Sequence, residues 1–382
     1  MAIDALENLP DISFIDNMTL SDIQNQMVER YQEKYEELTG KPANLARADP
    51  MTLLLYATAT FLYQHALRLD NRGKMNLLKY STGEFLDNLA ALKRISRNGA
   101  SVAVVTMRFA LSDVRTSVVS IPEGTRVQTE DIFFETLDYA EIEAGDLTAD
   151  ILCRCMTEGV VGNGFEPGSI ITLVDPIPYV ASVVNIDVSA GGADVESDDS
   201  LRERLYLAPA GYSTAGAKDS YIYWAKSFSS AVSDVVVDDP PEDPGSVVVS
   251  FLINGEVPTQ SIIDSMDDWL NDKTIRPLTD HLTVQAPAIE YFEVELTYYI
   301  NASDYSKVTS IQNAVQAAVS EYITWQTSAI GRDLNPDELI KRVVAAGAKR
   351  VEVVSPVYTT ISAQTVASMT DTSVTYGGLE DD

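Results

Sequence analysis

Hydrophobic residues recur at every third or fourth position through the first 95 residues, a spacing that predicts amphipathic helices. One helix is expected to start at Thr19 and to end at Gly40. A second is expected to start at Asp49 and Pro50, because aspartate caps a helix N-terminus and proline suits the first helical position. The sequence therefore predicts a helical N-terminal region.

The apolar stripe on these helices has two interpretations. In the first, the stripe packs inside this chain. In the second, it packs against a helix of a partner protein, and this interpretation is favoured by the small core that so short a helical region can form by itself. Gly73 and Gly83 are expected to interrupt the helical pattern that follows. The stripe residues assigned to a candidate partner-helix interface are Met27, Tyr31, Tyr35, Leu54, Phe61 and Leu62.

From about residue 100 to 190 the hydrophobic period changes from about four to two. Val102 and Val104 alternate with Ala103 and Val105, and short runs of this kind are separated by turns rich in glycine and proline. This pattern is typical of an antiparallel β-sandwich or a barrel-like β domain.

Helices and strands mix beyond residue 200. Tyr221 to Val237 and Leu339 to Val354 both read as a helix, a short loop and a valine-rich strand, which indicates a degenerate repeat. Asn335 with Pro336 is a strong signal for the start of the helix in the second copy. The expected fold class is α+β multidomain, with an N-terminal helical region, a central antiparallel β domain and two tandem small α/β sandwich domains. The expected boundaries are 1–95, 96–192, 193–289 and 290–382, the last including a C-terminal tail.

Composition narrows the class of protein. The 382 residues carry a formal net charge of −30, so a nucleic-acid surface is not expected, because phosphates would be repelled. The N-terminus lacks the pattern of a secretory signal, and the best apolar run, Met51 to Tyr63, is shorter than the ~20 residues of a membrane span. Cys153 and Cys155 suit a cytosolic protein without disulfides.

The sequence offers little for catalysis, and no catalytic, cofactor or metal residue is assigned. His65 and His281 lie far apart without motif partners, and a single Cys-x-Cys pair lacks the second cluster that a zinc site needs. Three loops are not interpreted as nucleotide, nucleophile or cation sites: Gly162–Pro167 stands among predicted strands, Gly211–Gly216 reads as a turn before a helix, and Asp238–Pro244 reads as an exposed loop. No enzyme is expected.

The segment from Gly191 to Arg204 is the most informative part of the chain. A pair of glycines runs into an acidic cluster, and Ser200 with Glu203 has the spacing of a helix capping box. The two arginines are expected to fork onto carboxylates of Asp194, Glu196, Asp198 or Asp199. A charge-stapled hinge between domains is one interpretation, and a solvated loop is the other. The residues assigned to the hinge are Gly191, Gly192, Asp194, Glu196, Arg202 and Arg204.

This GG-x-D-x-E…LR-x-R arrangement resembles that of the baseplate J-like family. Further stretches match in the same order, and they are Thr82–Ala90 (G-E-x-L-D), Ile121–Val127 (I-P-x-G-T), Gly162–Gly164 with Ile177–Asn185, and Thr214–Gly216 with Tyr221–Ala225. The resemblance spans roughly residues 80 to 300.

The resemblance implies a structural baseplate wedge subunit of a contractile tail or tail-like injection machine, located in the baseplate and made and assembled in the bacterial cytoplasm. Its implied partners are other wedge proteins, further copies of itself, the central hub or spike, and sheath-proximal proteins, arranged in a six-fold ring that rearranges on sheath contraction. The N-terminal helices would join a bundle with neighbouring wedge chains. The alternatives are a tail-associated adhesin or carbohydrate-binding module and, more weakly, a cell-wall hydrolase.

Overall fold

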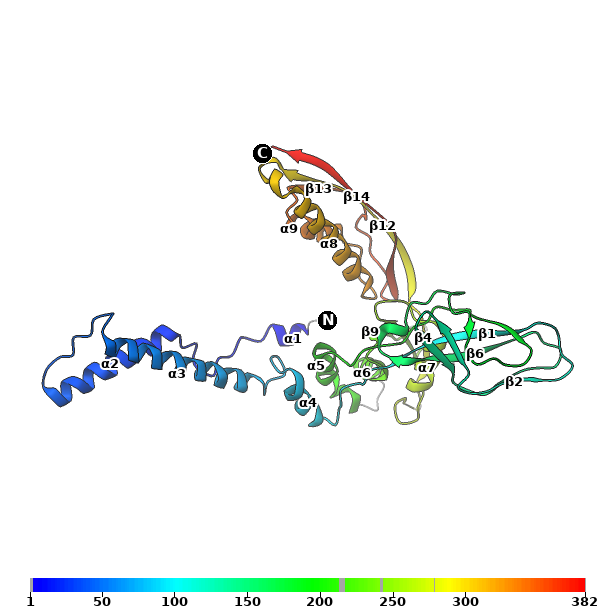
Figure 1. Ribbon diagram of the computed structural model, residues 1–382, viewed down its shortest axis with the longest axis horizontal. Coiled ribbons are helices and arrows are strands. Elements are labelled where there is room, and N and C mark those ends of the chain that lie inside the picture. The colour runs from blue at the N-terminus through cyan, green and yellow to red at the C-terminus, as the bar shows by residue number, and fades with distance from the viewer. Residues whose placement is uncertain (1–2, 213–216, 241–242, 278, 382) are drawn as a thin grey trace. The chain divides into compact units, whose positions relative to one another are not determined.

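The computed structural model describes residues 3–212, 217–240, 243–277 and 279–381. The chain divides into two compact units, Met1–Arg97 with Asp198–Leu205, and Asn98–Ser197 with Tyr206–Asp382. The first is helical and the second combines helices with β-sheets, so the fold is α+β and multidomain (Figure 1). No described helix combines the length and the apolar composition needed to cross a bilayer.

The helical unit is built on a hairpin of two long helices that lie side by side (Figure 1). Thr19 and Asp22 form a capping box at the start of the first helix, which ends at Gly40, and Asp49 caps the second by accepting the N–H of Met51. These starts agree with the sequence prediction. The helices are α1 (Asp4–Glu7), α2 (Leu20–Thr39), α3 (Pro50–Lys74), α4 (Gly83–Ala91) and the start of α5 (Asp198–Leu207).

Gly73 does not interrupt the second helix, contrary to expectation, because α3 continues to Lys74. A β-carbon at this position would lie 2.6 Å from the ring of Phe14. The glycine therefore serves the close packing of the N-terminal segment against the helix.

The β domain of the second unit is an antiparallel sheet whose described strands follow the order β7-β3-β4-β6-β1-β8. The edge strands β7 and β8 also contact each other, so the sheet nearly closes into a barrel. Inward residues alternate along β1 as predicted, from Ala103 to Leu111, and they form one core with β6. The strands are β1 (Val102–Leu111), β2 (Val119–Ile121), β3 (Arg126–Thr129), β4 (Ile132–Thr136), β5 (Ala140–Ile142), β6 (Thr148–Glu158), β7 (Thr172–Leu173) and β8 (Val180–Asn185), and β2 pairs with β5.

Two α/β modules follow, and their sheets share one pattern. In each three-stranded sheet a central strand has one antiparallel and one parallel neighbour, in the orders β11-β10-β9 and β13-β12-β14. Each module has its own apolar core. The elements are α6 (Lys218–Phe228), β9 (Val232–Asp238), β10 (Ser246–Ile253), α7 (Gln260–Leu270), β11 (His281–Gln285), β12 (Ala288–Asn301), α8 (Val308–Thr327), α9 (Pro336–Ala345), β13 (Arg350–Ser355) and β14 (Thr365–Glu380).

The C-terminal tail expected from the sequence is instead strand β14. It pairs in parallel with β12 from Ala288↔Thr365 to Asn301↔Glu380, and it buries Val366 and Ala367. Its residues alternate only weakly in hydrophobicity, so the pairing with a distant strand decides the structure of this segment.

Candidate functional site: the Gly191–Arg204 segment and the helical surface

The paired glycines at the start of the candidate segment are held tightly by the β domain. The Gly192 N–H donates to Asn163 Oδ1 at 2.8 Å, and Asn163 Nδ2 donates to the Gly192 carbonyl at 2.8 Å. A β-carbon on Gly192 would lie 2.4 Å from the Gly159 carbonyl oxygen. Ser101 Oγ donates to the Gly191 carbonyl at 2.9 Å. Glycine is therefore required at 192 by close approach of the backbone.

Gly191 also lines a cavity of about 380 Å³ beside the start of β1. The other walls come from α7, from the end of α6 with the loop that follows it, and from the end of β10, and they include Ile262, Phe228 and Ile253. The described lining of the cavity is mainly apolar and includes no histidine, cysteine or carboxylate.

The two acidic residues assigned to the hinge differ in burial. Glu196 is only 4% exposed, and its Oε2 accepts the Asn98 N–H at 2.8 Å while its own N–H donates to the Asn98 carbonyl at 3.1 Å. Asp194 is exposed, and its carbonyl accepts Ser230 Oγ at 2.9 Å. Glu196 thus fixes the path of the chain, whereas Asp194 is exposed and its carboxylate lies against Gly159.

The helix after this segment starts earlier than expected. α5 begins at Asp198, so Ser200 lies inside the helix and the prediction of Ser200 as the N-cap is wrong. Asp198 and Asp199 occupy the first turn, where carboxylates interact favourably with the helix dipole.

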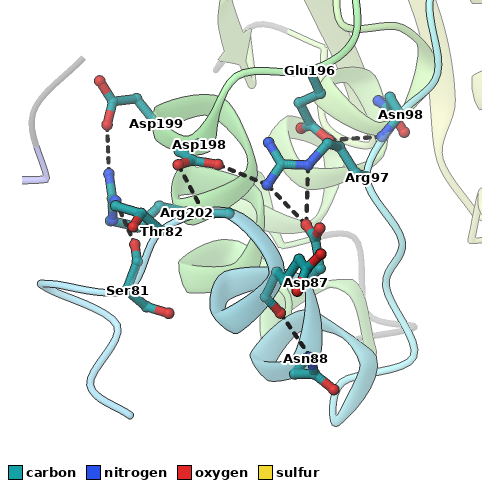
Figure 2. Close-up of polar contacts among 12 residues, drawn as sticks. Ser81, Thr82, Asp87, Asn88, Arg97, Asn98, Glu196, Asp198, Asp199 and Arg202 are labelled. Atoms are coloured by element: carbon teal, nitrogen blue, oxygen red, sulfur yellow. Dashed lines mark hydrogen bonds and ion pairs between the residues drawn. The ribbon is translucent and has the colours of Figure 1, made fainter. Parts of the chain in front are cut away.

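The arginines of α5 bind the loops that flank α4. Arg202 donates from Nε to the Leu78 carbonyl at 3.0 Å and from a terminal nitrogen to the Ser81 carbonyl at 2.8 Å, and it pairs with Asp199 (Figure 2). Arg204 is 5% exposed and donates to the Ser96 carbonyl at 2.6 Å. Both guanidinium groups therefore bind backbone carbonyls of the helical unit.

Asp198 joins two of the motifs that were distant in sequence. Its carboxylate accepts the N–H of Gly83, the first residue of α4, at 3.0 Å, and it pairs with Arg97 at 2.7 Å (Figure 2). Arg97 also pairs with Asp87 of α4 at 2.8 Å. The hydrogen bond from Gly83, together with Arg97, lowers the pKa of Asp198 below its usual range. The sequence does not reveal the roles of Asp87 and Arg97, although Asp87 is the aspartate of the G-E-x-L-D motif and Arg97 follows that motif within ten residues.

The candidate partner-helix residues lie on a poorly covered hairpin. Tyr35, Leu54, Phe61 and Leu62 are 39%, 60%, 66% and 48% exposed, whereas Met27 and Tyr31 are half-buried. The rings of Tyr31 and Tyr35 stack at 6.0 Å between centroids. The buried side chains described on these two helices are Ile23, Thr52 and Ala59. The hairpin therefore displays apolar surface to solvent.

The remaining chemical candidates lie apart. His65 is exposed on α3 and His281 is exposed at the start of β11. Cys153 and Cys155 are buried free thiols, and burial raises the pKa of Cys153 to about 12. Within the described residues, no three His, Cys, Asp or Glu side chains gather as metal ligands. Two of the three loops considered as chemical sites, Gly211–Gly216 and Asp238–Pro244, fall partly outside the described residues, at 213–216 and at 241–242. Thr214, Ala215 and Gly216 of the quoted motifs also lie outside the described residues.

Two family models match the sequence. The Baseplate J-like protein barrel domain matches residues 106–192, and the Baseplate J-like central domain matches residues 213–286. The first range covers most of the β domain, and the second covers the module around β9, β10 and β11.

Curated relatives and a solved structure are similar to parts of this chain. Baseplate protein J of Escherichia phage P2 is 30% identical over 192 residues, which is 50% of this chain and 62% of that protein. Phage-like element PBSX protein XkdT of Bacillus subtilis (strain 168) is 32% identical over 144 residues, 38% of this chain and 36% of that protein. The chain thus spans 36% to 62% of the length of these relatives. A chain of the cryo-EM structure of the anti-feeding prophage (AFP) baseplate aligns over 90% of both chains, with 13% identity and a TM-score of 0.36.

Proposed function

Because the chain belongs to the baseplate J-like family, we propose that it is a structural wedge subunit in the baseplate of a contractile tail or tail-like injection machine. In this proposal it assembles with other wedge chains and with copies of itself into a six-fold ring around the central hub, close to sheath-proximal proteins. It rearranges when the sheath contracts, and it catalyses no reaction. In this proposal the protein is made and assembled in the bacterial cytoplasm.

The observation that carries the wedge role is the bare apolar surface of the α2–α3 hairpin. Leu54 and Phe61 are each at least 60% exposed, and Leu62 is nearly half exposed. Removing apolar surface from water is favourable by about 25 cal/mol per Å², so helices of a neighbouring chain would be stabilised on this hairpin. Residues 1–95, and within them about 15 to 75, are accordingly proposed to enter a helical bundle with other wedge chains.

We propose that the Gly191–Arg204 segment sets the orientation of the two modules that follow the β domain. In this proposal the β domain spans residues 96–192, and the modules span residues 193–289 and 290–382. The division between the two compact units falls inside it, between Ser197 and Asp198. Gly192 is hydrogen-bonded to Asn163 of the β domain, and Arg202 is hydrogen-bonded to the Leu78 carbonyl of the helical unit. We call these anchoring contacts the latch, because they hold the segment at both of its ends.

The latch is tested with the double variant Arg202→Ala and Arg204→Ala, which we expect to impair particle assembly or sheath contraction. Arg202→Lys with Arg204→Lys is the matched variant, because it keeps the charge and removes the forked donors. If the alanine variant assembles and contracts as the wild type does, the latch role is wrong.

The wedge role is tested by producing the chain together with the proteins encoded beside its gene and imaging the purified complex by electron microscopy. We expect stable co-purification and placement in a six-fold ring. A self-sufficient monomer or trimer that binds cells or glycans would favour the adhesin instead, and turnover of peptidoglycan would favour a hydrolase.

A further inference from the structure

A groove of about 580 Å³ lies between α6 and α7 in the module around β10. Its walls combine aromatic rings with carboxylates, and among its described lining residues there is no lysine or arginine. The lining residues are Trp224, Phe228, Ser265, Asp268, Trp269, Asp272, Thr274 and Ile275.

The aromatic wall is held in a fixed arrangement. The ring of Trp269 lies 6.4 Å from the rings of both Trp224 and Phe228, tilted by 62° and 56°. The indole nitrogen of Trp269 donates to the Trp224 carbonyl at 3.0 Å, yet Trp269 remains 37% exposed. Because the rings do not stack face to face, part of the Trp269 ring remains open to a ligand.

The polar groups of the groove are mostly acceptors. Four lining side chains can donate a hydrogen bond, and three already do so within the chain: Trp269 to Trp224, Ser265 to the Ser261 carbonyl, and Thr274 to Asp272. Asp272 accepts the Thr274 hydroxyl and N–H through Oδ1, which leaves Oδ2 for a ligand. A ligand that fits must therefore bring donors rather than acceptors.

The C-terminal end of α7 also lacks the positive charge that helix ends favour. Its last turn has no basic residue, and it carries Asp267 and Asp268, where the helix dipole disfavours carboxylates. Lys273, exposed in the following loop, is the cation next to Asp272, and it contributes to lowering the pKa of Asp272, after the larger effect of the Thr274 hydrogen bonds. A further cation bound here would relieve the repulsion at the helix end.

We propose that this groove binds an arginine side chain presented by a partner protein. A guanidinium group carries five N–H donors and no acceptor, and its flat face stacks on tryptophan while its edge pairs with Asp268 and Asp272. A sugar offers hydroxyls that need donors as well as acceptors, and the groove presents few donors. The inference does not depend on the wedge assignment, because it follows from the chemistry of the groove alone.

The test is calorimetric titration of the full chain with a tetra-arginine peptide and with a tetra-lysine peptide, at about 0.15 M salt to screen long-range attraction. The groove variant is Asp268→Asn with Asp272→Asn. The control is Asp113→Asn with Asp146→Asn, which makes the same change in net charge at two exposed positions of the β domain. Trp269→Leu removes the stacking ring, and its fold is checked by thermal unfolding.

We expect the arginine peptide to bind at least several-fold more tightly than the lysine peptide. The groove variant and Trp269→Leu should each weaken it about tenfold, with the control changed less than about twofold. The proposal would be overturned if the groove and control variants lost the same affinity for the arginine peptide, or if the two peptides bound equally well. Either result would mean that binding reflects general charge attraction. The proposal would also be overturned if oligosaccharides changed the fluorescence emission of Trp224 and Trp269 while the arginine peptide left it unchanged.

Discussion

The carboxylate of Asp198 accepts the backbone N–H of Gly83 at 3.0 Å, although the two residues are separated by 115 positions in the sequence. Thr82, which stands at the N-cap of α4, makes no side-chain capping bond. Asp198 therefore supplies the missing acceptor at the helix N-terminus, where carboxylates are favoured. The bond joins the Thr82–Ala90 motif to the start of α5 within the helical unit.

Asp198→Ala should destabilise α4, because the Gly83 N–H loses its acceptor and Arg97 loses one of its two carboxylates. The loss of a helix cap costs about 1 kcal/mol. Hydrogen exchange of the amides in residues 83–91 measures it directly, as faster exchange by about fivefold. Asp199→Ala is the adjacent control, since its side chain is 84% exposed and pairs with Arg202 of its own helix. Equal acceleration in both variants would contradict the capping role.

The pair Arg126–Asp175 should impose a pH dependence on the β domain. Arg126 donates to both carboxylate oxygens of Asp175, at 2.9 and 2.8 Å, and these bonds, with the Arg126 N–H, lower the pKa of Asp175 to about 2. The unfolded carboxyl titrates near pH ~3.9, so the stabilisation is complete above that pH and is lost as the pH falls toward 2.

An NMR titration of the Asp175 side-chain carbon checks this prediction. Its midpoint should lie near pH 2 in the wild type. In Arg126→Gln the midpoint should move back toward the ordinary value, because the charged partner is gone. An unchanged midpoint in that variant would show that Arg126 does not cause the shift.

The starts of several helices could be predicted because capping is a local property. The side chains of Thr19, Asp49 and Asn335 each accept an N–H two or three residues further along the chain, so the signal is complete within a few positions. The alternation along β1 is equally local, since one face of the strand is buried. Elements specified by their own residues were therefore found from the sequence.

The contacts that could not be predicted depend on distant partners. β14 becomes a strand because β12 offers it a parallel edge, and nothing within the residues from Thr365 onward signals that pairing. The start of α5 shifted from Ser200 to Asp198, a residue whose carboxylate is held by Gly83 and Arg97 from outside its own helix. The sequence suggests only carboxylate partners for the two arginines, whereas Arg202 and Arg204 also bind backbone carbonyls.

Gly192→Ala should destabilise the β domain by about 1–3 kcal/mol, which is the range for forcing extra atoms into a packed site. The added carbon would lie 2.4 Å from the Gly159 carbonyl and 2.9 Å from Asn163 Oδ1, so the backbone itself would have to move. Urea unfolding followed by circular dichroism measures the change. Gly99→Ala is the control, because its added carbon would meet no atom within 4 Å. Similar losses in the two variants would argue against steric exclusion at 192.

Leu54→Ser with Phe61→Ser separates the stability of the chain from its assembly. Both side chains are at least 60% exposed, so the free energy of unfolding of the isolated protein should change by less than about 1 kcal/mol. If α2 and α3 pack against a partner's helices, the same change removes two large apolar contacts, and each buried side chain of this size is worth roughly 1.5–3 kcal/mol. The amount of the proteins encoded beside its gene that co-purifies with the chain should then fall by at least tenfold.

The matched control replaces two equally exposed apolar residues elsewhere, Ile171→Ser in the β domain and Val357→Ser in the last module, at 64% and 67% exposure. Assembly should survive these changes if the hairpin is the contact surface, since neither position lies on α2 or α3. Equal loss in both double variants would mean that assembly responds to surface polarity in general. Intact assembly in the Leu54 and Phe61 variant would mean that the exposed stripe binds no neighbouring helix.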